Sequence, residues 1–451
     1  MAIYSRIQFI SLCGLFSLAV FGATEADVRK ALEAKTGVIT LPAGEITLTK
    51  EILIEGAHDL DIRGPGTRLR AAISFNGRAM LRFVKSNRVR ISKLEFDGNR
   101  TALEVHVGLP PSDKTFLSFF RNNAIAAEDC DTFSVADVKF KQIAAFAVLG
   151  ARLKNVTIER IEVADSGSRN GKGRNNTSGG VLLEEGTARF TVRDSKFTNV
   201  RGNGVWTHSM YKSPRNADGL IAGNRFEQIA RDAIQVGHAT RVRVEKNTGA
   251  KIGYPVEEID AEGGGTPVGI DTAGNVDLSS YTGNRFEEVN GKCIDLDGFH
   301  DGTIARNTCI NKGRGEEYPW GHFAIVMNNT NPDMQSTKIR IEDNVIDGTK
   351  FGGIFVIGTN NVVVRNKLRN INRAQCGDVG AKNGCLTFPK EPDLLRTGIY
   401  LGDHAERPSI ARANQVTDNE INGHRMAKFC VGASPQVKMS ENKVERNRCG
   451  E

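Results

Sequence analysis

The sequence is poor in aromatic residues, in helical periodicity and in long apolar segments. Aromatic residues make up 7% of the 451 residues, with two Trp and six Tyr. Long amphipathic patterns of the 3.6-residue period are nearly absent, which excludes helical bundles and coiled coils. After residue 25 no segment is apolar enough to cross a bilayer as a helix. We therefore expect strands and turns, and no contact with a membrane once the leader is removed.

An excess of charge of one sign is also missing. The net charge is +7, and the 60 Lys and Arg residues are scattered along the chain. A nucleic-acid partner would need them clustered, so the pattern gives no case for one, and it favours an anionic substrate only weakly. The 48 Gly residues, together with frequent Asn, indicate many turns.

The cysteines lack the spacing of a zinc site, because no Cys-x-x-Cys and no neighbouring histidine pair occurs. Seven of the eight cysteines follow residue 25, and this odd number leaves at least one thiol unpaired. Two cysteines close a short polar loop and form the first expected bridge, and two further pairings are considered after it. These three pairs are Cys376–Cys385, Cys293–Cys309 and Cys430–Cys449.

The first residues have the pattern of an export signal. Arg6 precedes the apolar run IQFISLCGLFSLAVFGA, and small and polar residues follow. Residues 1–25 are therefore predicted to be a signal peptide and residues 26–451 the mature chain, secreted or periplasmic. A single-span anchor is the alternative. Export would also permit disulfides.

A repeat organises the mature chain. Apolar alternation, a turn and a second alternation recur, as in DAIQVGHATRVRVEKN (232–247), CIDLDGFHDGTIARNTC (293–309) and GGIFVIGTNNVVVRNKL (352–368). Equivalent positions such as Phe286 and Cys309 lie 23 residues apart, and Ile346 and Leu368 lie 22 apart. This period, without helices, predicts an all-β, right-handed parallel β-helix of 22–23-residue coils in a single domain. Leucine-rich repeats are the rival, but their leucine spacing is missing.

The N-terminal segment predicts a cap followed by entry into the first coils. Residues 24–34 form an amphipathic pattern with Val28, Ala31 and Leu32 on one side, which is typical of a short helix covering an exposed sheet edge. The motifs VRKALEAKTGVITLPAGEITL and LDIRGPGTRLRA resemble the opening of the pectate-lyase-like superfamily. With the repeats, this resemblance spans nearly the whole mature chain. It implies the β-helix fold but leaves lyase, hydrolase, epimerase and binding functions open.

Aligning the first strand of each coil places some residues side by side on the outward face. Ile294 and Leu296 point inward, so Asp295 and Asp297 point outward, and Asp271 takes the place of Asp295 one coil earlier. His208 and His300 are predicted to support these three carboxylates. The residues expected to bind substrate on the same face are Trp206, Gln235, His238, Trp320, Asn328, Phe355 and Tyr400.

Insertions are predicted to wall a groove beside this face. They lie at 165–178, 251–267, 312–322 and 371–396, and three of them directly precede a first strand. Long loops on one side of a rigid scaffold commonly carry function. We therefore expect a polysaccharide or oligosaccharide partner in the groove of a monomeric protein.

Three crowded aspartates fit glycoside hydrolysis, which needs a protonated and an ionised carboxyl group. Hydrolysis by Asp271, Asp295 and Asp297, without a cofactor or metal, is the function that we expect. The alternative is that the three aspartates form a row of hydrated surface carboxylates that has no catalytic role. In the polygalacturonase-like hydrolases of the superfamily, aspartates directly precede the strand, whereas Gly291 and Lys292 stand there in this sequence. The resemblance therefore implies the fold and not those catalytic roles.

Two further functions stay open. A polysaccharide lyase acting on a uronate would use a basic residue, with Ca²⁺ held by the three aspartates. The possible bases are Lys172, Arg174, Lys251, Lys292 and Arg314. A non-catalytic glycan-binding surface protein is the third possibility, although it would not require loops and acids to be concentrated at the middle of the chain.

Overall fold

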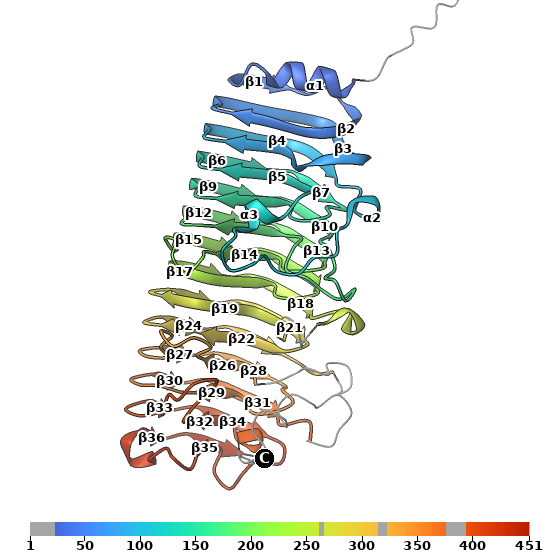
Figure 1. The fold of residues 1–451 in the computed structure, drawn as a ribbon. Coiled ribbons are helices and arrows are strands. Elements are labelled where there is room, and N and C mark those ends of the chain that lie inside the picture. The colour runs from blue at the N-terminus through green and yellow to red at the C-terminus, as the bar shows by residue number, and fades with distance from the viewer. Residues whose placement is uncertain (1–22, 261–265, 314–322, 376–393, 451) are drawn as a thin grey trace, which may run out of the picture.

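Short alternating segments become strands because each one pairs with the equivalent segment one coil later. The computed structural model describes residues 23–260, 266–313, 323–375 and 394–450. Within them the chain winds as a parallel β-helix, with successive coils stacked along one axis (Figure 1). The predicted all-β fold of stacked coils is therefore confirmed.

Each coil contributes strands to three faces. The chain opens with β1 (Gly37–Thr40), β2 (Gly44–Glu55) and β3 (His58–Val84). We name the faces A, B and C in chain order.

Face A continues from β3 through β5 (Asn123–Glu128), β8 (Val148–Ala151), β11 (Val181–Glu184), β14 (Val205–His208), β17 (Ile234–Glu245), β19 (Val268–Asp277), β22 (Lys292–Asp297), β26 (Ile325–Asn328), β29 (Ile354–Val356), β32 (Ile399–Leu401) and β35 (Val431–Ala433).

Face B comprises β4 (Asn87–Asp97), β6 (Asp131–Ala136), β9 (Lys154–Glu159), β12 (Ala188–Arg193), β15 (Asn216–Ala222), the end of β17, β20 (Ser280–Thr282), β24 (Thr303–Ala305), β27 (Arg340–Glu342), β30 (Val362–Val364), β33 (Gln415–Thr417) and β36 (Lys443–Glu445). The short β23 (Phe299–His300) pairs with the end of β19.

Face C runs from the end of β4 through β7 (Lys139–Lys141), β10 (Glu162–Ser166), β13 (Lys196–Val200), β16 (Arg225–Ile229), β18 (Thr248–Ile252), β21 (Arg285–Val289), β25 (Thr308–Ile310), β28 (Val345–Asp347), β31 (Lys367–Ile371), β34 (Glu420–Gly423) and β37 (Arg448–Gly450).

The interior of the coil stack is filled by aligned apolar side chains. Ile270, Ile294 and Ile325 pair in register on successive coils and are 0% exposed. Phe197 and Phe226 stack with ring centroids 5.0 Å apart. Because the side-chain period of a strand is two, this inward column fixes which residues of each strand point outward.

The predicted N-terminal cap is also confirmed. Helix α1 (Glu25–Leu32) begins with a capping box in which Thr24 and Asp27 satisfy one another's backbone N–H groups. Val28 and Leu32 are buried against the first coils. Among the described residues, no helix has both the length and the apolar character needed to span a membrane.

An excursion at residues 98–122 was not predicted. It leaves the stack after β4, forms α2 (Arg100–Leu103) and α3 (Phe116–Phe119), and lies over face A. Phe116 and Phe120 pack there with Phe146 and Trp206, outside the coil interior. This second apolar cluster covers the N-terminal half of the face.

Two of the predicted disulfides are formed, Cys293–Cys309 and Cys430–Cys449. Among the described cysteines, Cys130 is a buried free thiol, in agreement with the prediction of at least one unpaired thiol. Cys376 and Cys385 lie outside the described residues, as do the signal segment 1–22 and most of the two insertions 312–322 and 371–396.

Candidate active site

The outward columns of face A lie in the predicted register. Asp271 pairs with Asp295 on the next coil, and Gln235 pairs with Asp271 on the coil before. Asp295 pairs in turn with Val326, and Asp297 with Asn328. Three aspartates therefore meet on β19 and β22, near the middle of the coil stack.

Lys292 lies within this group. Its Nζ donates to Oδ2 of Asp295 at 2.5 Å, and its side chain is 16% exposed. The burial of Lys292 acts to lower its pKa, but the charges of Asp295, Asp271 and Asp297 outweigh burial and raise it. The lysine is therefore held in its charged form, beside carboxylates that compete for it.

A fourth carboxyl group joins the cluster. Asp232 precedes β17, is 1% exposed and accepts a hydrogen bond from the N–H of Val268 at 3.0 Å. Burial raises its pKa to about 6, and the charge of Asp295 adds to the effect. Asp232 was not among the predicted site residues. A signal existed, because Asp232 and Lys292 both stand two residues before the aligned isoleucines.

The carboxyl group of Asp271 is held by an amide relay. Nε2 of Gln235 donates to its Oδ2 at 2.7 Å, and Nδ2 of Asn203 donates to Oε1 of Gln235 at 2.7 Å. Asp271 keeps part of its surface open, yet the crowding of protein atoms raises its pKa well above the ordinary value, and Asp232 and Asp295 raise it further. The relay fixes the position of a carboxyl group that favours its protonated form.

Asp297 lies at the outer edge of the cluster. Its two oxygens accept hydrogen bonds from the N–H and the hydroxyl of Thr330, both at 2.8 Å. Burial raises its pKa to about 6, and the charge of Asp295 acts in the same direction. Hydrogen bonds alone would lower that pKa, so burial is the larger effect here.

One oxygen of the cluster has no partner. Oδ1 of Asp295 is buried, and no donor among the described residues reaches it. Buried acceptors without a partner are rare in native proteins, and each one needs an explanation such as a functional role or a bound water or ion. Asp295 therefore presents one oxygen fixed by Lys292 and one oxygen without a hydrogen bond.

The predicted supporting histidines lie elsewhere. His300 is on β23, where Asn275 and Asp301 occupy its two ring nitrogens at 2.9 and 2.8 Å. His208 is on β14, three coils before Asp295, and its ring contacts Trp206 and Phe116. The prediction that both side chains adjoin the aspartates is wrong, because the turn after the strand carries His300 toward face B.

The aromatic side chains predicted as open sugar platforms are buried. Trp206 is 5% exposed because Phe116 of α3 packs on it, with ring centroids 4.6 Å apart. Phe355 and Tyr400 stack on one another and are 3% and 1% exposed. Strand register alone does not reveal that the 98–122 excursion crosses the face at Trp206. Trp320 lies outside the described residues.

The other predicted binding residues have different surroundings. Gln235 is 4% exposed and holds Asp271, and the side chain of Asn328 accepts from the N–H of Asn329 at 2.8 Å. His238 contacts the ring of Tyr211 at 4.3 Å. Gln235 is therefore a positioning residue for the cluster.

Tyr211 is an exposed aromatic side chain that was not predicted. It is 55% exposed, and its hydroxyl donates to Oδ1 of Asp333 at 3.2 Å. Burial raises its pKa to about 12, together with the charges of Asp333 and Asp297. Tyr211 therefore contacts Asp333 in the loop after β26, and Thr330 of the same loop donates to Asp297. Only a loop between β14 and β15 brings it there.

Two of the predicted insertions contact one another. Nδ2 of Asn170 donates to Oδ2 of Asp260 at 2.6 Å, and Arg174 donates to the backbone oxygen of Glu257 at 2.8 Å. The loops that precede β11 and β19 therefore form a continuous wall at one edge of face A.

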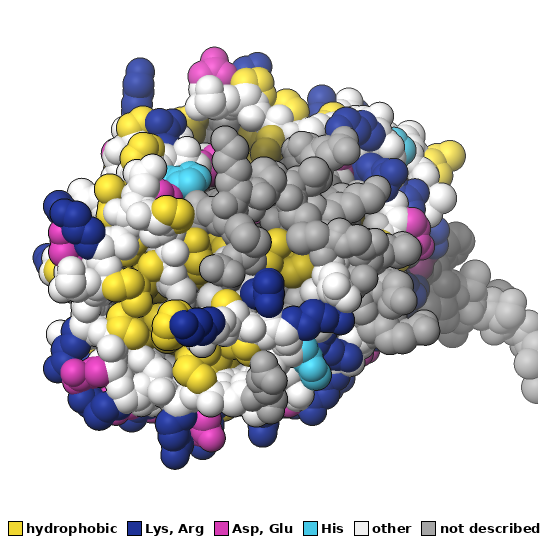
Figure 2. Space-filling model, turned by 90° about the horizontal axis from the view of Figure 1, so that it is seen from below, with side chains coloured by type: hydrophobic (Ala, Val, Ile, Leu, Met, Phe, Trp, Pro, Cys, Tyr) yellow, Lys and Arg dark blue, Asp and Glu magenta, His cyan; other side chains and the backbone are white. Residues whose placement is uncertain are grey.

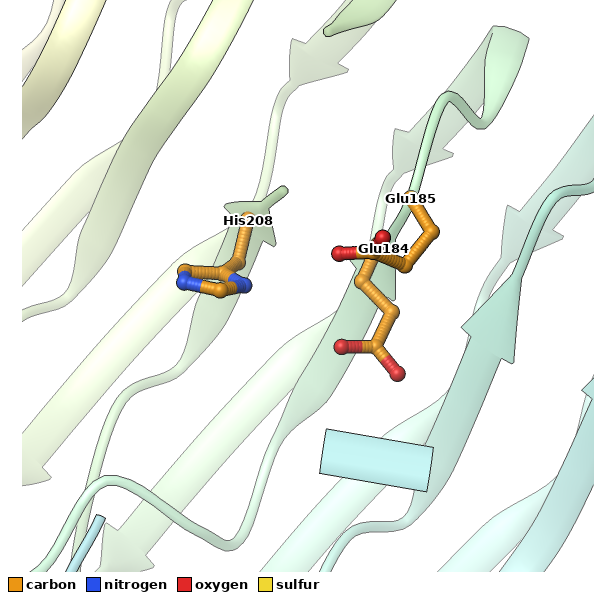
Figure 3. Close-up of side chains that lie close together, drawn as sticks. All are labelled: Glu184, Glu185 and His208. Atoms are coloured by element: carbon orange, nitrogen blue, oxygen red, sulfur yellow. The ribbon is translucent and has the colours of Figure 1, made fainter. Parts of the chain in front are cut away.

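A second group of ionisable side chains lies further toward the N-terminus on the same face. Ligand atoms of Glu184, Glu185 and His208 lie within 4.8 Å of one another (Figure 3). Among the described residues, Asp271, Asp295 and Asp297 do not form such a compact group. The calcium arrangement considered for a lyase thus has no preformed cage at the aspartates.

Comparisons with known proteins bear on the fold. Residues 82–256 match the family described as "Right handed beta helix region". A search of curated proteins finds no match. The surface adhesin PfbA of Streptococcus pneumoniae is 12% identical, with a TM-score of 0.52, over 90% of this chain and 87% of the adhesin.

Two enzymes have similar folds. The A-module of mannuronan C-5 epimerase AlgE4 from Azotobacter vinelandii is 10% identical, with a TM-score of 0.58, over 93% of this chain and 95% of the module. The catalytic unit of a GH87 α-1,3-glucanase from Streptomyces thermodiastaticus is 12% identical, with a TM-score of 0.53, over 94% of this chain and 65% of the enzyme. At these identities the likeness concerns the fold. As the resemblance to the pectate-lyase-like superfamily implied, the chain is a right-handed parallel β-helix.

Proposed function

We propose that the protein is an extracellular carbohydrate-active enzyme that hydrolyses glycosidic bonds of a polysaccharide at the aspartate cluster, acting as a monomer. One observation carries the proposal: Nζ of Lys292 donates to Asp295 at 2.5 Å, while burial raises the pKa values of the neighbouring Asp271 and Asp297. Asp271 is thereby suited to donate a proton, and Asp295, paired with Lys292, is suited to act as the base or nucleophile, which are the two roles that hydrolysis requires.

The roles follow from these environments. Asp271 donates its proton to the glycosidic oxygen, which leaves as a hydroxyl group. Asp295 acts on the anomeric carbon or on the water that attacks it, and Lys292, which donates to its Oδ2, balances its charge. Water supplies the hydroxyl of the new reducing end, and its remaining proton returns to the carboxyl pair.

The rim of the cluster supports a glycan partner. Tyr211 is 55% exposed and contacts the loop whose Thr330 holds Asp297, and its ring packs edge-to-face against His238. Such an aromatic face suits the apolar side of a sugar ring. The fold similarity to a glucanase catalytic unit and to a mannuronan epimerase is consistent with a carbohydrate substrate.

Lys292 argues against the lyase. A lyase base must be unprotonated to remove a proton from the substrate. The surrounding aspartates raise the pKa of Lys292, which keeps it an ammonium group. Of the candidate bases, Arg174 donates to Glu257 and Lys172 pairs with Asp260, so both are engaged in the loop wall.

The test is a screen of the purified protein on neutral and uronate-containing glycans. Reducing ends and the absorbance of unsaturated products are followed together. Hydrolysis gives reducing ends alone, and EDTA leaves the rate unchanged. Unsaturated products with a calcium requirement would establish the lyase instead, and binding without turnover would establish a glycan-binding protein.

Variants locate the activity. Asp271→Asn and Asp295→Asn are each expected to lower kcat by about 10²-fold or more, because each removes one of the two proton-handling groups. The matched control is Asp218→Asn, an exposed carboxylate of face B paired with Arg241. Turnover at the wild-type rate in both cluster variants would refute the assignment.

A further inference from the structure

Glu184, Glu185 and His208 form a second polar site on face A, apart from the aspartates. Glu184 ends β11, Glu185 follows it, and His208 ends β14 on the next coil, in register with Glu184. Figure 3 shows the carboxyl group of Glu185 and the imidazole ring of His208 facing one another, with the carboxyl group of Glu184 beside them and turned toward α3. The aspartates lie on β19 and β22, two and three coils further along the stack.

The two glutamates are buried without a counter-ion. Glu184 is 0% exposed and Glu185 is 5% exposed, and no described Lys or Arg forms an ion pair with either. Their hydrogen bonds come from backbone N–H groups: Phe116 and Leu117 donate to Glu184 at 2.9 and 2.8 Å, and Met210 donates to Glu185 at 2.8 Å. Two adjacent buried carboxylates repel one another unless a cation or a proton joins them.

His208 provides a nitrogen that no hydrogen bond occupies. Its Nδ1 is buried, and no donor or acceptor among the described residues reaches it. With its proton on Nε2, the neutral ring offers the lone pair of Nδ1 to a ligand. A bound cation would offset the repulsion between Glu184 and Glu185 and would give Nδ1 of His208 a partner.

We propose that Glu184, Glu185 and His208 bind a divalent transition-metal ion of the Zn²⁺ type. One imidazole nitrogen and two carboxylates are a donor set that such ions accept, with water completing the coordination. Glu184 keeps its second lone pairs while accepting the N–H groups of α3, so a metal and the backbone can share it.

The site would tie the 98–122 excursion to the coil stack. Glu184 already holds the first turn of α3, and Phe116 lies against both His208 and Trp206, at 5.0 and 4.6 Å between ring centroids. A metal that fixes Glu184 and His208 also fixes the surface on which Phe116 packs. We infer a structural metal site that stabilises the cover over the N-terminal half of face A.

The test measures metal binding directly. Full-length protein is stripped with a chelator, desalted and titrated with ZnCl₂, and bound zinc is counted by mass spectrometry. One Zn²⁺ per chain is expected, with a higher melting temperature of the loaded protein. His208→Gln and Glu185→Gln should weaken the affinity at least tenfold and abolish the thermal shift, while His58→Gln, an exposed histidine beside Asp59, should change neither.

A measurement on the wild-type protein tests the proposal even if the variants fail to fold. Zn²⁺ should slow the acylation of His208 by diethyl pyrocarbonate, mapped by peptide mass, and leave that of His58 unaffected. The absence of bound zinc in the wild type would overturn the proposal. So would full zinc occupancy in folded His208→Gln and Glu185→Gln proteins, or acylation of His208 that zinc does not slow.

Discussion

Asp297 shows how the surroundings of a strand change the proton affinity of one side chain. Two hydrogen bonds from Thr330 favour its ionised form, but burial and the charge of Asp295 raise its pKa to about 6 from an ordinary value of 3.8. A group whose folded-state pKa is raised binds its proton more tightly in the folded protein. The folded state therefore loses stability as the pH rises from about 4 to about 6.

We predict that Asp297→Asn makes the protein more stable at pH 7 than the wild type, on the order of 2 kcal/mol, with little difference at pH 4. The amide cannot ionise, and its oxygen can still accept from the N–H of Thr330. Melting temperatures of both proteins across this pH range test the prediction.

Asp218→Asn is the control, and it is expected to lower the stability at pH 7, where Asp297→Asn raises it. Arg241 lowers the pKa of Asp218, so that carboxylate stabilises the fold at pH 7 and loses this effect in acid. A pH-independent difference between Asp297→Asn and the wild type would contradict the role assigned to burial.

The sequence predicted the alignment of Asp271 with Asp295, because the inward isoleucines fix register and the strand period is two. It did not predict that Trp206 would be covered, because Phe116 reaches it from 90 residues earlier in the chain. Tyr211 was missed for a similar reason. The spacing of the repeats predicts the positions of side chains in the strands. The positions of loops outside the coil stack depend on tertiary packing, which the repeat does not reveal.

A ladder of asparagine side chains joins the strands of neighbouring coils. In each step the N–H and Nδ2 of one asparagine donate to Oδ1 of the asparagine one coil later, as Asn284 does to Asn307 at 3.0 and 2.9 Å. The ladder consists of Asn224, Asn247, Asn284, Asn307, Asn344, Asn366, Asn419 and Asn447. The asparagine that precedes an apolar residue in each repeat was visible in the sequence, but its partner was not.

We predict that Asn307→Ala lowers the free energy of unfolding by about 2–4 kcal/mol, because it leaves the two Asn284 donors and the oxygen of Tyr281 buried without partners. Asn422→Ala, at an exposed position of β34, should change it by less than about 0.5 kcal/mol. Urea unfolding followed by circular dichroism measures both. Equal urea midpoints for the two variants would refute a supporting role for the ladder.

The two ends of the stack are protected in different ways. Helix α1 covers the first coil, whereas the last coil presents apolar side chains interspersed with Lys and Arg (Figure 2). Phe429 is 67% exposed there, with Nζ of Lys428 5.4 Å from its ring centroid. Charge at a sheet edge discourages pairing with another chain.

We predict that Leu32→Asp converts the protein to oligomers, because a buried charge detaches α1 and bares the edge of the first coil. Lys30→Ala, on the exposed side of the same helix, should leave it monomeric. Size-exclusion chromatography with light scattering distinguishes the two. A monomeric Leu32→Asp protein would show that α1 is dispensable as a cap.

The asparagine ladder also has a direction along the chain. In each step the N–H and one Nδ2 hydrogen of an asparagine pair with the Oδ1 of the next asparagine, while the other Nδ2 hydrogen donates to a backbone oxygen of the preceding coil. When a chain folds from its N-terminus, the last ordered coil therefore exposes an asparagine N–H and Nδ2 that can pair with the next asparagine. We therefore expect coils to be added to the stack from the N-terminus, because an ordered coil presents the donors that position the next asparagine.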